Sequence, residues 1–353
     1  MFKFFKEWYD THLTDPNQVA LALIILSISI ITYILLSTVA PILVAIILAY
    51  MLEGLVGRFK QNSNFSRKIV VLIVYTSFIA LSVLILFLLL PVMLEQLTTL
   101  IKSVPSILEK GKSLVLNFTS KENNFITDSQ LTDIFNSLNS EVSLLGSSIV
   151  AYSLSSAESL LEIIIFTLIV PILIFFLLYD KEDINGWFKK FFPEKLDLSK
   201  KAYAELDLKI GNYIRCKFIE IIIVWFASSF LFAILGLNYS LLLGFLCGIS
   251  VIIPYVGAIV VTIPIIFVAY FQWGTSSDFW YVILAHILVQ VIDGNVVVPV
   301  LFSDAVNLHP LAILISILFF GTIWGIWGVF FAIPLAVLVN TLLNIWPKLD
   351  YKN

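Results

Sequence analysis

The sequence predicts an all-α, polytopic integral membrane protein with about eight membrane-spanning segments. Of its 353 residues, 60% are hydrophobic and only 13% are charged, and the mean hydropathy is +1.01. A soluble fold of this length does not have enough interior to bury so much apolar surface. The apolar residues also fall in runs of about 20, the length that crosses about 30 Å of hydrocarbon. The lipid bilayer is therefore the expected partner, and the net charge of -3 is too small to indicate nucleic acid.

Eight apolar runs account for the predicted segments. They lie at 18–38, 39–56, 69–91, 159–179, 218–237, 241–271, 279–301 and 310–346. The first run resembles a signal peptide, because Lys3 and Lys6 precede it and a small-x-small triplet ends it at Ala40. Pro41 follows that triplet directly and the run is too long for a signal sequence, so we expect a membrane span. The second span would follow it through a tight turn.

The basic residues predict the orientation. The N-terminal tail, the loop at 57–68, the segment 180–217 and the C-terminal tail hold 17 of the 21 Lys and Arg residues. Alternating spans place these four regions on one side, which the positive-inside rule makes cytoplasmic. We therefore expect a multi-pass protein of the inner membrane with both termini in the cytoplasm. Region 92–158, with the other four lysines and seven carboxylates, is expected outside.

The chain is thus divided into five consecutive parts. Region 92–158 contains two stretches with apolar residues at helical spacing, Leu97 to Leu108 and Leu131 to Ile149, which predict a small helical extracytoplasmic insert rather than a ligand-binding domain. The parts are three N-terminal spans (1–91), this insert (92–158), a fourth span (159–179), a charged cytoplasmic amphipathic segment (180–217) and a membrane half without Lys or Arg (218–347).

The membrane half 218–347 is the predicted place of the transport site. It contains Glu220, Asp278, Asp293 and Asp304 but no basic residue. An ionisable group at bilayer depth is costly, so it usually faces a bundle interior or a water-filled path. A lining of carboxylates suits a cation, a proton or a neutral polar solute.

The sharpest pattern in this half is a polar stripe. His286, Gln290 and Asp293 are spaced i, i+4 and i+7 and therefore share one helix face. Gly294 and Asn295 follow at once, so we expect the helix to break there and to free backbone carbonyls beside Asp293. We predict Asp293, Gln290, His286, Asn295 and Glu220 as the substrate or ion pathway. The alternative is that the stripe holds packed helices together.

Runs 241–271 and 310–346 are too long for one crossing and carry helix-breaking residues. Broken helices or re-entrant hairpins are the natural solution, and eight full spans or six spans with two hairpins remain open. Five residues are predicted to break helices or to act in gating: Pro254, Gly257, Pro299, Pro310 and Pro334.

Five short motifs in this order resemble the autoinducer-2 exporter family, also called PerM-type permeases. They are Leu208 to Arg215 (LKIGNYIR), Ile253 to Gly257 (IPYVG), Gln290 to Pro299 (QVIDGNVVVP), Leu308-His309-Pro310 and Ala332 to Leu335 (AIPL). The sequence departs from the family at Cys216-Lys217, where Gly-Gln is frequent. The resemblance implies an inner-membrane transporter, linked in some members to autoinducer-2 export and in others to sodium-proton antiport.

These observations predict a secondary transporter or permease for a small polar solute or a monovalent cation and protons. A passive channel or a scaffold that transports nothing is the alternative. The chain carries no zinc-protease, serine-hydrolase or Walker A signature, so we expect no enzyme activity, no catalytic residue, no metal and no cofactor. Self-association into a homo-oligomer is left open.

Overall fold

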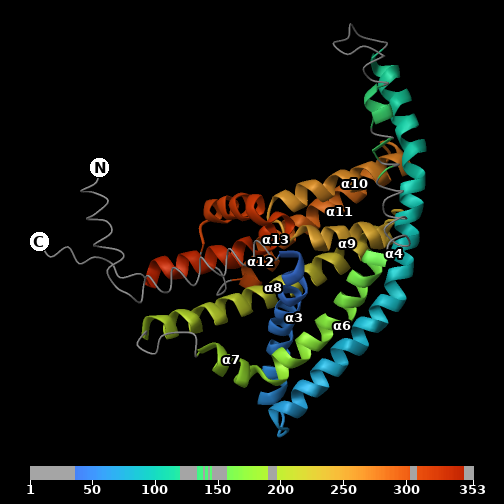
Figure 1. Cartoon of the computed structure of the whole chain (residues 1–353). Helices are drawn as coiled ribbons and strands as arrows, with labels where there is room; N and C mark the ends of the chain where they lie inside the picture. Colours follow the sequence, from blue (N-terminus) through green and yellow to red (C-terminus); the bar gives the residue numbers. More distant parts are fainter. Residues whose placement is uncertain are drawn as a thin grey trace, which may run out of the picture. The chain divides into compact units, whose positions relative to one another are not determined.

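The structure is a computed structural model that describes residues 36–119, 133–137, 140–141, 144, 157–189, 197–302 and 308–345. Every element within these ranges is a helix (Figure 1). Five helices of the described chain are long and apolar enough to cross a membrane: Ala40–Gln61, Arg67–Ser106, Asp207–Ile234, Val256–Trp273 and Ser277–Phe302. The all-α membrane class is confirmed. The total of eight spans stays a prediction, because residues 18–35 of the first run lie outside the described residues.

The chain forms two compact units. Unit 1 consists of Met1–Thr76, Leu168–Ile219 and Val297–Asn353, and unit 2 of Ser77–Thr167 and Glu220–Val296. Each unit therefore combines segments that are far apart in the sequence. The predicted division into five consecutive parts is not tested by this arrangement and stays a prediction.

Helix α3 (Leu36–Gln61) corrects the predicted turn between residues 38 and 39. The chain runs as one helix through this point, with Pro41 inside it. Proline removes one backbone donor, but its φ of about −65° is compatible with a helix, so it does not by itself end one.

Helix α4 (Arg67–Thr119) is longer than the predicted span 69–91. Its 53 residues would extend about 80 Å at 1.5 Å per residue. It continues through Pro91 and Pro105, so the helical stretch predicted at 97–108 belongs to the same helix as the third span. In the second predicted helix of the insert, residues 133–137 are helical, and most of the remainder lies outside the described residues.

Helix α6 (Ala157–Tyr179) begins two residues before the predicted fourth span and ends with it. Helix α7 (Lys181–Lys189) follows after one residue. Helix α8 (Asp197–Ile234) joins the predicted charged segment to the predicted fifth span in one helix of 38 residues. The boundary expected at residue 217 is therefore not a break in the backbone.

The predicted interruption of run 241–271 is present. Helix α9 (Ser240–Ser250) ends before a turn at 251–255, and helix α10 (Val256–Trp273) begins after it. The two helices pack against each other. Gly257 lies so close to Ser250 that a Cβ there would overlap with the Ser250 carbonyl oxygen, which explains the small residue at this point.

Helix α11 (Ser277–Ile292) packs against α10 and continues into a π-helical turn, η1 (Asp293–Val297), and a short helix, α12 (Val298–Phe302). The helix is wider here, because its backbone hydrogen bonds join residues five rather than four positions apart, and it does not break. Pro299, predicted to break a helix, is the second residue of α12.

Helix α13 (Pro310–Ile345) is two helices joined at Gly325, whose φ of 59° and ψ of −136° are not helical. Gly328 lies against the carbonyl oxygen of Phe320, so the chain folds back on itself at this point. The break predicted at Pro334 is wrong: Pro334 is buried inside the second half, and the turn is at a glycine that adopts positive φ without a Cβ penalty.

Candidate functional site

The core of unit 2 positions the predicted polar stripe. Buried side chains from α8, α9, α10 and α11 form one apolar cluster, including Phe232, Leu243, Ile265 and Val282. Helix α11 therefore presents one face to the other three helices. His286, buried to 1% exposure, and Val289 lie on that face.

His286 is held by two neighbouring helices. Its Nε2 is 2.9 Å from the hydroxyl of Thr262 on α10, and its Nδ1 is 4.0 Å from the Cys247 thiol on α9. The Thr262 hydroxyl donates its one hydrogen to the carbonyl of Ala258 at 2.7 Å, so it must accept from His286. The imidazole therefore carries its hydrogen on Nε2, and Nδ1 is left to accept from the thiol. His286 thus links α11 to the α9–α10 hairpin, as the packing interpretation predicts.

Gln290 and Asp293 lie one and two turns beyond His286. Gln290 is half-buried, and its side-chain nitrogen has no hydrogen-bond acceptor among the described residues. Asp293 is 8% exposed and is the first residue of the π-helical turn. A buried donor and a buried carboxylate next to irregular helix are what a path for a polar solute requires. Gln290, unlike His286, is not accounted for by hydrogen bonds among the described residues.

The π-helical turn modifies the prediction for Asn295. Its side-chain nitrogen donates to the carbonyl of Val291 at 2.9 Å. The Asn295 amide nitrogen is therefore bound within the chain. Asn295 itself is exposed.

Glu220, the reserve carboxylate, lies on α8 and is 2% exposed. Helices α8 and α11 run in opposite directions, and Phe232 of α8 packs near the His286 ring, with a centroid separation of 6.3 Å (Figure 1). Glu220 precedes Phe232 by about three turns, and Asp293 follows His286 by about two turns. Both carboxylates therefore lie toward the same end of unit 2.

A buried lysine lies directly before the membrane half 218–347, which has no Lys or Arg. Lys217 is 6% exposed and lies one turn before Glu220 on α8. Its amine also lies over the ring of Phe302 at 5.3 Å, and the adjacent Cys216 thiol donates to the carbonyl of Leu301 at 2.9 Å. The Cys216-Lys217 pair, where the sequence departs from the family, thus packs α8 against α12 in unit 1.

The remaining predicted residues lie at helix ends or turns. Pro254 is in the turn between α9 and α10, and Gly257 is in the first turn of α10. Pro310 is the first residue of α13, where a proline is favoured, and His309 caps it by accepting from the backbone nitrogen of Leu311 at 3.2 Å. Asp304 lies outside the described residues.

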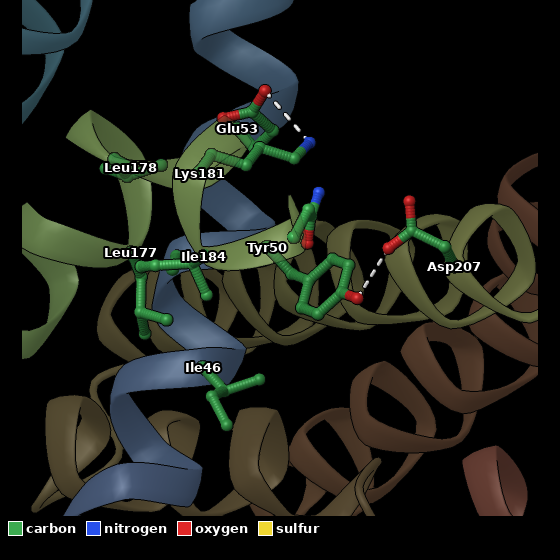
Figure 2. Close-up of a pocket in the computed structure, with 10 residues that line it drawn as sticks. Ile46, Tyr50, Glu53, Leu177, Leu178, Lys181, Ile184 and Asp207 are labelled. Carbon is green, nitrogen blue, oxygen red and sulfur yellow. Dashed lines mark hydrogen bonds and ion pairs between the residues drawn. The ribbon is translucent and has the colours of Figure 1, made fainter. Parts of the chain in front are cut away.

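Sequence analysis missed a polar cluster in unit 1, at the end of α3. Glu53 accepts from Arg67 at 3.0 Å. It also accepts from Lys181 at 3.1 Å, and the Tyr50 hydroxyl donates to Asp207 at 2.5 Å (Figure 2). Arg67 also donates to the carbonyl of Leu178 at 3.0 Å. The one signal available was Glu53, a carboxylate inside the predicted span 39–56.

These residues border a pocket of about 90 Å³. It is lined by Ile46, Ala49, Tyr50, Glu53, Leu177, Leu178, Lys181, Ile184, Asn185 and Asp207. Helices α3, α6, α7 and α8 all contribute, and the ion pairs of Glu53 join α3 to α7 and to the start of α4. The two ion pairs compensate the charge of Glu53 near the end of a membrane helix, which is a structural role. No group of three His, Cys, Asp or Glu in the described part of the chain could hold a metal ion.

Comparison with known proteins identifies the family. The profile of the AI-2E family transporter matches residues 20–348. The chain is 39% identical to the Escherichia coli K12 protein named "Putative permease PerM", over 98% of both chains. It is 22% identical to "Putative transport protein YrrI" of Bacillus subtilis, over 86% of this chain and 85% of that one. The chain therefore belongs to the AI-2E family of membrane transporters, as the order of its motifs predicted, and it is a transporter rather than an enzyme.

Proposed function

We propose that the protein is a secondary transporter of the inner membrane that moves a small polar solute or a monovalent cation. In this proposal, Asp293 is the carboxylate that couples movement of the substrate to protons, and Gln290 lies beside it in the path. The buried position of Asp293 at a π-helical turn is the observation that supports it most directly. Export of autoinducer-2 and sodium-proton exchange are the two candidate reactions.

The chemistry of a buried carboxylate supports coupling. A carboxylate at bilayer depth is costly to keep charged, so it gains from binding either a proton or a cation. Exchange of one for the other on a single group would link the two movements. His286 is then a positioning residue, since its contacts to Thr262 and Cys247 hold the helix that carries Asp293.

The test is flux into proteoliposomes that contain the full chain, with sodium, lithium, protons and autoinducer-2 as probes. We expect Asp293→Asn to insert normally and to lower proton-coupled flux by at least about tenfold, with little remaining pH dependence. Asp278→Asn is the matched control, because Asp278 is exposed at the start of the same helix.

Two outcomes would contradict this assignment. If Asp293→Asn keeps the wild-type rate and pH profile while Glu220→Gln does not, the coupling group is Glu220. If wild-type flux neither saturates nor responds to a proton gradient, the protein is a passive channel, and if no probe moves at all it is a scaffold.

We also propose that both termini are cytoplasmic and that region 92–158 is outside, which places 17 of 21 basic residues on the inner side. A cysteine introduced at Ser120 should react with an impermeant thiol reagent in cells with an accessible outer face of the inner membrane. Labelling that requires permeabilisation of that membrane would reverse the orientation.

A further inference from the structure

The turn between α9 and α10 contains an unusual backbone conformation at a tyrosine. Tyr255 has a φ of 64° and a ψ of −52°, and the backbone nitrogen of Val256 donates to the carbonyl of Pro254 at 2.7 Å. This hydrogen bond across one residue, with positive φ at the centre, defines the rarer and strained form of γ-turn. Glycine would adopt it far more easily than a bulky side chain. The tyrosine is thus present despite a conformational cost.

The rest of the hairpin holds this turn in place. At its base, the Gln272 side chain donates to the carbonyl of Gly236 and accepts from the backbone nitrogen of Asn238, both at 2.8 Å. Near its apex, Gly257 lies against the carbonyl oxygen of Ser250. Because both ends are closed, the strain at Tyr255 cannot be relieved by opening the hairpin.

Packing does not account for the tyrosine. The Tyr255 side chain is 59% exposed. Tyr239, the other described non-glycine residue with positive φ, packs against the core of unit 2 instead. Burial of an apolar ring offsets the backbone cost at Tyr239. At Tyr255, which is exposed, no such burial offsets the backbone cost.

The length of the hairpin arms indicates what surrounds Tyr255. The 11 residues of α9 extend about 17 Å and the 18 residues of α10 about 27 Å. A base at one membrane surface therefore places the apex at most about 27 Å into the roughly 30 Å of hydrocarbon, just short of its far edge. Irregular backbone at that depth is tolerated only where it is covered by protein or faces water. Since the described residues leave Tyr255 largely uncovered, the turn that carries it is expected to face water.

We propose that Tyr255 lines the solute path at the apex of the α9–α10 hairpin and that its hydroxyl contacts the passing solute, which makes it a specificity-determining residue. The inference rests on the proposed transport function. A phenol hydroxyl both donates and accepts hydrogen bonds, so it suits a small polar solute and can also place its oxygen on a cation. The strained turn keeps this side chain pointing away from the core.

The first experiment asks whether Tyr255 lies beside water. The full chain carrying Tyr255→Cys is treated in proteoliposomes with a charged thiol reagent, next to Ile263→Cys, a 65% exposed position on α10, and next to the wild type. We expect Tyr255→Cys to react at least about tenfold faster than Ile263→Cys, because the reactive thiolate forms only where water is present. Equal rates at the two positions would overturn the proposal.

The second experiment asks whether the hydroxyl touches the solute, with sodium and autoinducer-2 as the two probes. For the probe that the wild type transports, Tyr255→Phe should raise KM at least about threefold with a maximal rate within about twofold, since one hydrogen bond to the bound solute is lost. Tyr239→Phe loses the same atom in the core and should keep the wild-type KM. An unchanged KM in Tyr255→Phe would overturn this inference alone.

Failure of the proposed function gives a different result. If the wild type moves neither probe, solute contact at Tyr255 falls together with the proposed function. The labelling rates still decide whether Tyr255 faces water.

Discussion

Two helical hairpins in this protein solve the same geometric problem with different residues. In α9–α10 the strained turn residue is Tyr255, whereas in α13 the turn is made by Gly325. Both hairpins then place a glycine, Gly257 or Gly328, against a carbonyl oxygen of the preceding helix. The close approach to the carbonyl therefore needs glycine in both hairpins. The residue with positive φ in the turn, by contrast, is a glycine only in α13. The difference suggests that the α13 turn serves the fold and that the α9–α10 turn serves a second purpose.

The hairpins also differ in how they are held. Helix α11 is linked to α10 by the hydrogen bond between His286 and Thr262 at 2.9 Å. The second half of α13 contributes Ile333 and Val337 to the apolar core of unit 1. A polar link fixes one rotation of a helix about its axis, while apolar packing tolerates small shifts. The α9–α10 hairpin thus combines an apolar core with a polar link, and it packs against α11, the helix that leads to the predicted coupling carboxylate.

The largest effect is expected where the two hairpins agree. Gly257→Ala and Gly328→Ala each place a methyl group onto a backbone carbonyl. We expect a cost of about 3 kcal/mol, the upper end of the usual range for overpacking, since backbone cannot move aside. We expect both variants to lose most of the yield of folded protein and to melt earlier in detergent. Gly294→Ala is the control, because its Cβ would meet no atom within 4 Å. Wild-type melting of either variant would show that the close approach is not required.

A smaller effect is expected where the hairpins differ in polar contacts. Thr262→Val leaves the buried Nε2–H of His286 without an acceptor, which costs about 1–3 kcal/mol. The double variant Thr262→Val with His286→Leu removes both partners and should recover part of that loss. Comparison of the melting temperatures of the two single variants and the double variant measures the coupling. Strict additivity would mean that the hydrogen bond contributes nothing to stability.

The smallest effects should have opposite signs in the two turns. Gly325→Ala forces a Cβ into positive φ and should destabilise the protein by about 1–2 kcal/mol. Tyr255→Gly relieves strain but adds freedom to the unfolded chain, so a net gain of up to about 1 kcal/mol is expected. Thermal melting of the purified variants checks both. A loss of stability in Tyr255→Gly would show that the tyrosine ring supports the fold.

The sequence by itself determined the class of the protein and the position of several elements. Hydropathy predicted a helical membrane protein, and the fourth span, the interruption at Pro254 to Gly257 and the helix start at Pro310 follow from local composition. The stripe of His286, Gln290 and Asp293 also follows from helical periodicity. These features depend on residues within a few turns of one another, so a linear pattern is sufficient.

Only the tertiary structure decided which residues of such a pattern act as packing contacts. Pro334 was predicted to break its helix, yet a proline φ fits a helix, whereas the positive φ at Gly325 does not. His286 has a packing role within the predicted stripe, because it contacts Thr262 and Cys247 from two other helices. Tyr50 and Asp207 meet across 157 positions of sequence. Such contacts are set by how helices pack, and periodicity within one helix contains no information about its neighbours.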